Sequence, residues 1–280
     1  MQNRRKPSYR EIFQRNYGVF SETEQKSIRN ARVMIVGCGG VGGTVAIELC
    51  RSGVENFLLV EPDTYSVTNM NRQASCYSDT LGMNKAEALR KDMLRINKEC
   101  EIDIIKSVIP IKELGSRMSD SSVLMASADD FAYSIIASRI AKKMGIPSVI
   151  GLPLGSLVRV WSSTEESPDI EDYFALPKNE PDYRALHDAL YNSEEKHIYA
   201  RWAQKHCDWN EEWAEGYAKN EFSLAQIAPI VYMAASLAAL EILKLITRRW
   251  EPVVFPRYWR ITPTYAGIDE FRFKEYHDPR

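Results

Sequence analysis

Three glycines at a fixed spacing follow a short apolar run and could hold a phosphate group. Gly37, Gly39 and Gly42 form a Gly-x-Gly-x-x-Gly pattern directly after residues 32–36. Without Cβ atoms at these positions, backbone amides at the start of the next helix can face phosphate oxygens. Glu61 ends the next apolar run, where a carboxylate can accept both ribose hydroxyls. The pattern predicts a nucleotide site, and the alternative is that the glycines serve only close helix–strand packing.

A second set of polar residues favours ATP over NAD. Residues 68–73 (TNMNRQ) gather amides and a guanidinium in a loop that an NAD site does not need. Arg72 and Lys85 would neutralise charge on a triphosphate as pyrophosphate leaves, although Lys85 alone could be an ordinary surface lysine. Asp129 and Asp130 follow a later apolar run, where a carboxylate can hold Mg²⁺. Asp130 is nearer the next helix, so we expect it to be the N-cap and Asp129 to bind the metal.

Alternating strand and helix patterns must position these residues. Helices are predicted at 21–30, 42–52, 85–97 and 130–144, and strands at 32–36, 57–60, 101–108, 122–126 and 148–152. Such alternation predicts an α/β fold, a Rossmann-like and mainly parallel sheet with helices on both faces.

The second half of the chain has a different character. Residues 161–222 are polar and aromatic and indicate a long crossover insertion or lid, before an apolar helix at 229–247 and strand-like alternation at 253–273. We therefore divide the chain into an N-terminal helical segment (1–30), a nucleotide-binding part (31–160), the insertion (161–222) and a C-terminal helix and strands (223–280) that complete the same domain.

Composition and charge limit the partners. Hydrophobic residues make up 45% and charged residues 26%, the balance of a soluble globular protein. A net charge of −2, with an acidic run at residues 165–172, gives no reason to expect nucleic acid. Five cysteines without a Cys-x-x-Cys pair suggest neither a disulfide framework nor a zinc site. No signal peptide heads the chain and polar residues interrupt its apolar stretches, so we expect a cytoplasmic protein with no membrane contact.

Taken in order, the motifs resemble those of the ThiF/MoeB family, the adenylating superfamily that includes ubiquitin-activating enzymes. The segment RNYGVFSETEQKSIRNARVMIVGCGGVGG resembles the one that leads into the family's glycine loop. The segments VEPD, TNMNRQ and GMNKAEALRKDMLRINKE are similar to the family's ribose, arginine and lysine motifs. The segment APIVYMAASLAALEILKLI is similar to the helix with which the family builds its core and its homodimer contact. The resemblance covers most of the chain.

The resemblance implies ATP and Mg²⁺ as cofactors, a homodimer, and specific roles for the matching residues. Gly39 and Gly40 would approach the nucleotide, Glu61 would bind ribose and Asp129 magnesium. The phosphates would be served by Asn69, Arg72, Gln73 and Lys85, and the expected nucleotide site also includes Gly37, Gly42, Asp63 and Asn71. The family also uses an N-terminal arginine on the γ-phosphate, often across a dimer; Arg15 is the nearest match and Arg10 the second.

The sequence departs from the family pattern at several places. Glu61 replaces the usual aspartate and is one methylene longer, and Ala126 stands where an aspartate is usual. The zinc-binding cysteine pairs of many members are missing. Cys207, beside His206, is the only cysteine in the insertion; adjacent residues on a helix do not face each other, so a buried cysteine is favoured over a thioester nucleophile.

The predicted function is an adenylyltransferase that activates a carboxylate as an acyl-adenylate. The carboxylate could belong to the C-terminal glycine of a small ubiquitin-like protein, a peptide, a modified tRNA base or a small metabolite. Aromatic residues of the insertion could form its pocket or simply cover the sheet. The alternatives are a non-catalytic nucleotide-binding partner protein and an NAD-linked oxidoreductase, which the glycine loop and Glu61 alone would support.

Overall fold

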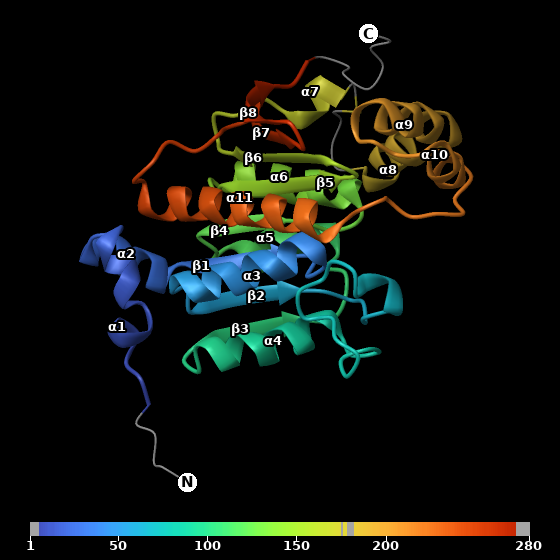
Figure 1. Cartoon of the computed structure of the whole chain (residues 1–280). Coiled ribbons are helices and arrows are strands. Elements are labelled where there is room, and N and C mark those ends of the chain that lie inside the picture. Colours follow the sequence, from blue (N-terminus) through green and yellow to red (C-terminus); the bar gives the residue numbers. More distant parts are fainter. Residues whose placement is uncertain (1–5, 175, 178–181, 273–280) are drawn as a thin grey trace.

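An eight-stranded mixed sheet forms the centre of the molecule (Figure 1). The computed structural model describes residues 6–174, 176–177 and 182–272. The strands lie in the order β3-β2-β1-β4-β5-β6-β7-β8. Their bounds are β1 Arg32–Val36, β2 Asn56–Val60, β3 Glu101–Ile105, β4 Val123–Ala126, β5 Ser148–Leu154, β6 Leu157–Ser163, β7 Arg257–Thr262 and β8 Tyr265–Glu270.

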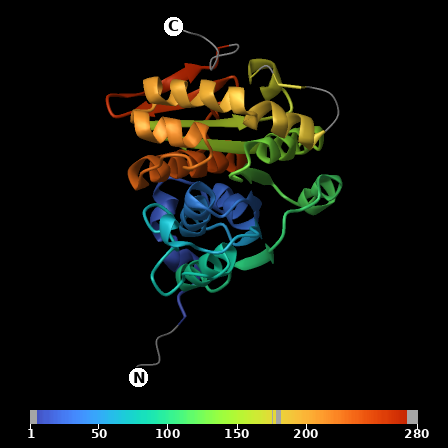
Figure 2. The same cartoon turned by 90° about the vertical axis from the view of Figure 1, so that its right-hand side faces the viewer.

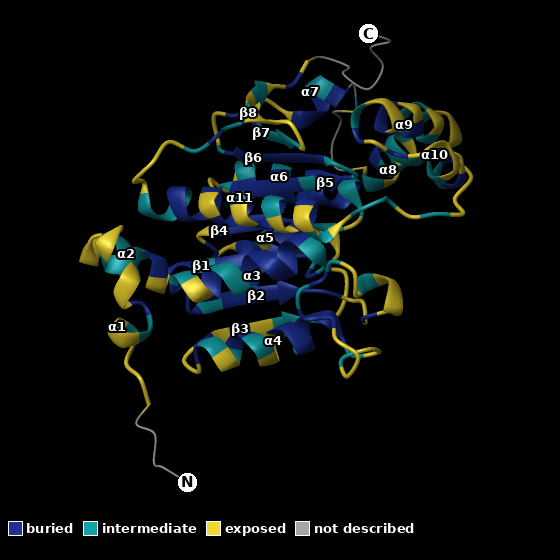
Figure 3. Cartoon of the chain, viewed as in Figure 1, coloured by how far each residue is buried: buried dark blue, intermediate teal, exposed yellow. Residues whose placement is uncertain are grey.

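The first five strands in this order pair in parallel, as the alternating pattern predicts. The central strands are short, apolar and buried (Figure 3), because helices cover both faces of a parallel sheet. The Rossmann-like fold is therefore confirmed. β3 ends at residue 105 rather than 108, since the chain then turns through Pro110 into a helix.

The other three strands extend the sheet in antiparallel fashion, which the sequence pattern did not predict in detail. β5 and β6 form a hairpin in which Leu154 pairs with Leu157, and Gly155 takes a positive φ of 54°. β6 crosses the predicted domain limit at 160. The strand-like alternation at 253–273 becomes β7 and β8, with residue 273 outside the described part.

Helices cover the two faces of the sheet in separate layers (Figure 2). One face carries α3 (Gly40–Ser52), α4 (Lys85–Ile96) and α11 (Ala228–Thr247), and the other carries α5 (Ile111–Met118) and α6 (Phe131–Lys143). Each layer encloses its own apolar core against the strands. Predicted and observed helix bounds agree within two residues, and α5 was missed.

Helix α11 is anchored in the first of these cores. By length and composition alone it could cross a membrane, but 56% of its apolar window is buried, as in a core helix. Glu241, fully buried on it, accepts hydrogen bonds from Ser162 Oγ at 3.0 Å, Val253 N at 2.8 Å and Trp259 Nε1 at 2.8 Å. These bonds fasten α11 to β6, to β7 and to the segment between the helix and β7.

The insertion and the N-terminal segment lie at opposite ends of the parallel strands (Figure 1). α7 (Ile170–Phe174), α8 (Tyr183–Tyr191), α9 (Ser193–His206) and α10 (Glu211–Ala218) follow β6, and α8 to α10 lie beyond the carboxyl ends of the parallel strands. α1 (Tyr9–Ile12), η1 (Gln14–Gly18) and α2 (Glu22–Asn30) pack at the amino ends, where Asn16 Nδ2 donates to Ser52 O at 2.9 Å. The helix predicted at 21–30 is α2, and a capping box of Ser21 and Glu24 begins it.

Candidate functional site

The glycines of the loop between β1 and α3 serve two different purposes. Gly37 has a φ of 88°, and a Cβ there would lie 2.4 Å from Ser127 O. A Cβ on Gly42 would lie 1.9 Å from Gly37 O. Both are therefore required by the turn itself. At Gly39 the nearest obstacle to a Cβ is Gln73 Nε2 at 3.6 Å, and the residue borders a cavity. Gly37 and Gly42 therefore serve close packing, as the alternative interpretation of the pattern holds, whereas Gly39 leaves room for a ligand.

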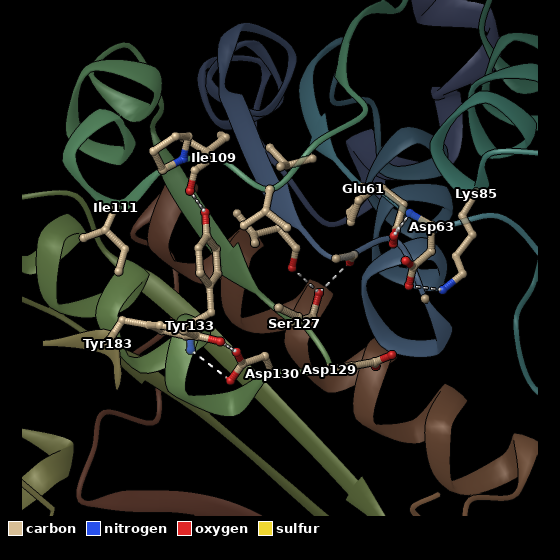
Figure 4. A pocket seen from close by; sticks show the side chains of 18 residues that line it. Glu61, Asp63, Lys85, Ile109, Ile111, Ser127, Asp129, Asp130, Tyr133 and Tyr183 are labelled. Atoms are coloured by element: carbon tan, nitrogen blue, oxygen red, sulfur yellow. Dashed lines mark hydrogen bonds and ion pairs between the residues drawn. The ribbon is translucent and has the colours of Figure 1, made fainter. Parts of the chain in front are cut away.

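That cavity has a volume of about 440 Å³ and lies at the carboxyl ends of β1, β2 and β4 (Figure 4). Its apolar part is lined by Val36, Val60, Val108, Ile109, Pro110, Ile111 and Tyr133. Its polar part is lined by Glu61, Asp63, Lys85, Ser127, Asp129, Asp130 and Tyr183. A flat apolar ring and a hydroxyl-bearing sugar with a charged group fit these two parts, which is the chemistry of a nucleotide.

Glu61 sits at the tip of β2 with only 4% of its surface exposed. Its Oε2 accepts from Cys38 N at 2.7 Å and its Oε1 from Asp63 N at 2.9 Å. Burial raises the pKa of this carboxyl, and those two backbone hydrogen bonds oppose the rise. A carboxylate has about four acceptor positions, so these bonds leave capacity for ribose hydroxyls.

Lys85, the first residue of α4, is 5% exposed, so it is not an ordinary surface lysine. Its Nζ lies 3.2 Å from Asp63 Oδ2 at the edge of the cavity. Asn84, which sequence reasoning missed, caps α4 and donates from Nδ2 to Glu61 O at 2.8 Å and Asp63 O at 3.1 Å. An asparagine before a helical run is an N-cap signal that could have identified it.

Arg72 is held in place by three hydrogen bonds from its guanidinium. Nε donates to Gln226 Oε1 at 2.7 Å, and Nη1 donates to Thr68 O at 2.9 Å and Asn71 Oδ1 at 2.8 Å. Burial lowers the pKa of Arg72, and the charge of nearby Asp129 opposes this. Gln226 was missed, because no local pattern links it to a loop so distant in sequence.

The amides of the same loop have distinct positions. Asn69 Oδ1 accepts from Ser66 N at 3.0 Å and so shapes the short helix η2 (Val67–Asn69) rather than facing the first cavity. Asn71 Nδ2 donates to Gln226 O at 3.1 Å. Gln73 is buried beside Gly39, and its Oε1 has no hydrogen-bond partner in the described part of the chain. It is thus the loop amide that borders the glycine turn.

Asp129 and Asp130 differ in their contacts, and the predicted N-cap role of Asp130 is confirmed. Asp130 caps α6, with Oδ1 accepting from Ala132 N at 2.9 Å, and it also accepts a hydrogen bond from Tyr183 OH. Asp129 is exposed and makes no hydrogen bond to any residue that the structure describes. The described residues contain no cluster of three potential metal ligands, but Mg²⁺ in phosphate sites typically uses one or two carboxylates, phosphates and water. Asp129 fits that requirement.

A second cavity, of about 480 Å³, adjoins the first. The two share Ser127, Ala128 and Asp129, and Gly40 borders the second one. The insertion closes its outer side, where Tyr191 OH accepts from Phe131 N at 2.8 Å. A nucleotide in the first cavity would therefore have a separate space beside it, next to the glycine loop.

Three other sequence candidates lie elsewhere. Arg15 is exposed on η1, beside the carboxyl end of α3 and so at the far end of that helix from the glycine loop. Arg10 forms an ion pair with Glu22 at 2.6 Å. Cys207 is fully buried, in agreement with the interpretation of a buried cysteine, and does not line either cavity.

A model of the ThiF family matches residues 13–279. Over 139 residues the chain is 30% identical to a tRNA threonylcarbamoyladenosine dehydratase of Bacillus subtilis, covering 49% of this chain and 54% of the relative. Over 146 residues it is 27% identical to the molybdopterin-synthase adenylyltransferase of Escherichia coli, covering 51% and 59%. The matched region thus spans a little over half the length of these relatives.

The fold has solved counterparts. The structure of E. coli MccB with ATP superposes with a TM-score of 0.70 at 20% identity, covering 94% of this chain and 71% of that one. At such low identity the likeness concerns the fold, and it extends through the insertion as well as the parallel sheet.

Proposed function

The chain belongs to the ThiF family, and on that premise we propose that it is an ATP-dependent adenylyltransferase that activates a carboxylate as an acyl-adenylate. A carboxylate oxygen of the substrate attacks the α-phosphorus of ATP, the bond from that phosphorus to the bridging oxygen breaks, and pyrophosphate leaves with the electron pair. Such a reaction requires positioning and charge neutralisation, with little covalent chemistry from the protein.

One observation carries the proposal: two cavities meet at Ser127, Ala128 and Asp129, beside the glycine loop. The adenosine occupies the first cavity, with its base against the apolar part and its ribose at Glu61. The acid enters the second. The α-phosphate then lies at the junction, where the acid can reach it.

Named residues account for the charge. Lys85, buried at the edge of the first cavity, and Arg72, fixed by its hydrogen bonds, face the phosphates and stabilise the charge that develops as pyrophosphate leaves. Asp129, whose carboxylate is uncommitted, holds Mg²⁺, which adds positive charge at the phosphates. Gly39 and Gln73 border the turn on which the phosphates lie.

We further propose that the protein works as a homodimer. Tyr232 and Leu240 are large apolar side chains that stay exposed on the outer side of α11, at 40% and 36%. Because Arg15 lies far from the glycine loop of its own chain, only a second copy could bring it to the phosphates.

We also propose a cytoplasmic location. All five cysteines lie in the described part and none forms a disulfide, which suits such a location.

The test is exchange of labelled pyrophosphate into ATP, with Mg²⁺ and a panel of carboxylic acids. Exchange that depends on one class of acid and disappears in Arg72→Ala and Asp129→Asn supports adenylation. Arg95→Ala, which alters a largely exposed arginine on α4, serves as the matched control and should retain exchange. Binding of ATP without exchange on any acid favours a non-catalytic nucleotide-binding protein, and binding of NAD instead of ATP favours an oxidoreductase.

A further inference from the structure

We propose that the carboxylate activated here is carried by an apolar body about the size of an aromatic side chain, and that it is not the diglycine tail of a ubiquitin-like protein. The acid is either a free small molecule or the last residue of a peptide. This inference rests on the proposed adenylation and specifies its substrate.

The size of the second cavity is the first argument. Its volume of about 480 Å³ lies within the range of roughly 300–1,000 Å³ that encloses a whole small molecule. A diglycine tail has no side chains, so it needs only a narrow channel for extended backbone. Most of this space would then stay empty or hold water against the apolar part of the wall, which is unfavourable.

The chemistry of the lining is the second argument. Apolar side chains come from three parts of the fold, namely Leu152 and Leu154 of β5, Phe131 of α6, and Leu190 and Leu224 in and after the insertion. Tyr191, Tyr199 and Tyr217 add aromatic surface. No lysine or arginine is among the described residues that line the cavity, so a second carboxylate or a phosphate on the acid would be uncompensated.

The direction in which the acid lies follows from the shared residues. Ser127 and Asp129 belong to both cavities, which places the reacting carboxylate at that end and the apolar body toward the insertion. The far wall is braced by ring contacts, with Tyr217 5.9 Å from Tyr199 and 5.3 Å from Trp209 between centroids. Such a wall resists collapse, so the space is available for a side chain.

The experiment compares acids that share the carboxylate and differ in the attached body. Pyrophosphate exchange is measured with 3-phenylpropionate, with the peptide Ala-Ala-Phe, with a peptide that ends in Gly-Gly, and with succinate. We expect exchange with the first or the second, which also separates a free acid from a peptide terminus. Exchange with the other two should be at least about tenfold slower, since even one methylene in an apolar pocket changes rates by that factor.

A pair of variants on one helix tests the location. Ala189 lines the second cavity from α8 and does not border the first, so Ala189→Phe should abolish exchange with the apolar acid while ATP still binds. Arg184→Phe places the same side chain on the exposed face of that helix and should leave exchange intact. Binding of acylsulfamoyl-adenosines to the unaltered protein gives an independent readout, with the 3-phenylpropionyl compound expected to bind at least about tenfold more tightly than the glycylglycyl compound.

The outcomes separate the two proposals. Exchange that is fastest with the Gly-Gly peptide, or equal affinity for the two analogues, overturns the inference about the substrate and leaves adenylation standing. Exchange with apolar acids that Ala189→Phe does not reduce, in a protein that folds normally, shows that the second cavity is not their site. If ATP binds and no acid of the panel supports exchange, the proposed function itself is contradicted, and this inference with it.

Discussion

The guanidinium of Arg72 donates from Nε to Oε1 of Gln226 at 2.7 Å, across 154 positions of sequence. Gln226 in turn donates from Nε2 to Pro153 O at 3.0 Å, at the end of β5. The loop that follows β2 is thus tied to the segment that leads into α11. This link holds the arginine near Asp129, which borders both cavities, and fixes the direction of the guanidinium.

Replacing Arg72 by lysine should slow adenylation although the positive charge remains. Lysine lacks the planar guanidinium that donates to Gln226 Oε1 and to Thr68 O at the same time. Its positive charge is therefore no longer held toward the phosphates. We expect the rate of pyrophosphate exchange to fall by about 100-fold, the usual cost of one lost transition-state donor. Gln226→Ala removes the hydrogen bond to Arg72 Nε as well as the one to Pro153 O. Because only the first of these orients the guanidinium, the barrier should rise by about 1 kcal/mol and the rate of exchange should fall roughly fivefold. A lysine variant with unaltered exchange would contradict the assigned role.

Two glycines of one turn should respond differently to alanine. Gly39→Ala meets its nearest atom at 3.6 Å, so the free energy of unfolding should change by less than about 1 kcal/mol while ATP affinity falls. Gly37→Ala forces a Cβ to 2.4 Å from Ser127 O at a φ of 88°, and should destabilise the protein by more than about 2 kcal/mol. Urea denaturation and ATP titration measure the two effects. An undiminished ATP affinity in Gly39→Ala would place the phosphates elsewhere.

The stability contribution of Glu61 should depend on pH in a definite direction. Burial raises the pKa of Glu61 above its ordinary value of 4.5, so the folded chain holds this proton more tightly than the unfolded chain does. The contribution is fully present below pH 4.5 and is lost as pH rises through the raised pKa. Glu61→Gln does not titrate, so its stability relative to the unaltered protein should improve as pH rises from 4.5 toward neutrality. Urea midpoints of both proteins, measured at several pH values, give this difference, and a constant difference would refute the prediction.

Glu241 should be important for stability and not for chemistry. Glu241→Ala removes the acceptor of several buried hydrogen bonds and leaves Lys244, whose Nζ lies 2.5 Å from its carboxylate and which is 7% exposed, without its counter-ion. The expected loss is about 3–5 kcal/mol in the free energy of unfolding. Glu241→Gln keeps an acceptor for Val253 N and should lose less. Equal losses in the two variants would mean that the loss comes from the charge, and that the acceptor kept by glutamine contributes nothing.

Local patterns sufficed for the parallel half of the fold and for the residues at its strand ends. Short apolar runs alternate with helical periodicity there, and each element is specified by neighbours within a few positions. Gly39, Glu61 and Lys85 could be placed for the same reason, because the carboxyl ends of parallel strands meet at one edge of the sheet. The N-cap role of Asp130 was equally local.

The antiparallel half and the outer wall of the site could not be read in this way. β6 pairs with β7 through contacts between segments about 100 residues apart, and no local pattern in either segment identifies its partner. The same holds for the hydrogen bond from Phe131 N to Tyr191 OH, which joins α6 to the insertion over 60 positions.

The sequence by itself determined the Rossmann-like sheet, the glycine turn and the order of the nucleotide motifs, since each depends on short-range spacing. Only the tertiary structure decided that Gln226 orients Arg72, that Arg15 lies at the opposite end of α3, and that a second cavity of about 480 Å³ adjoins the one at Glu61. A cavity is the space that several distant segments leave unfilled when they pack, so its volume and lining exist only after the chain has folded.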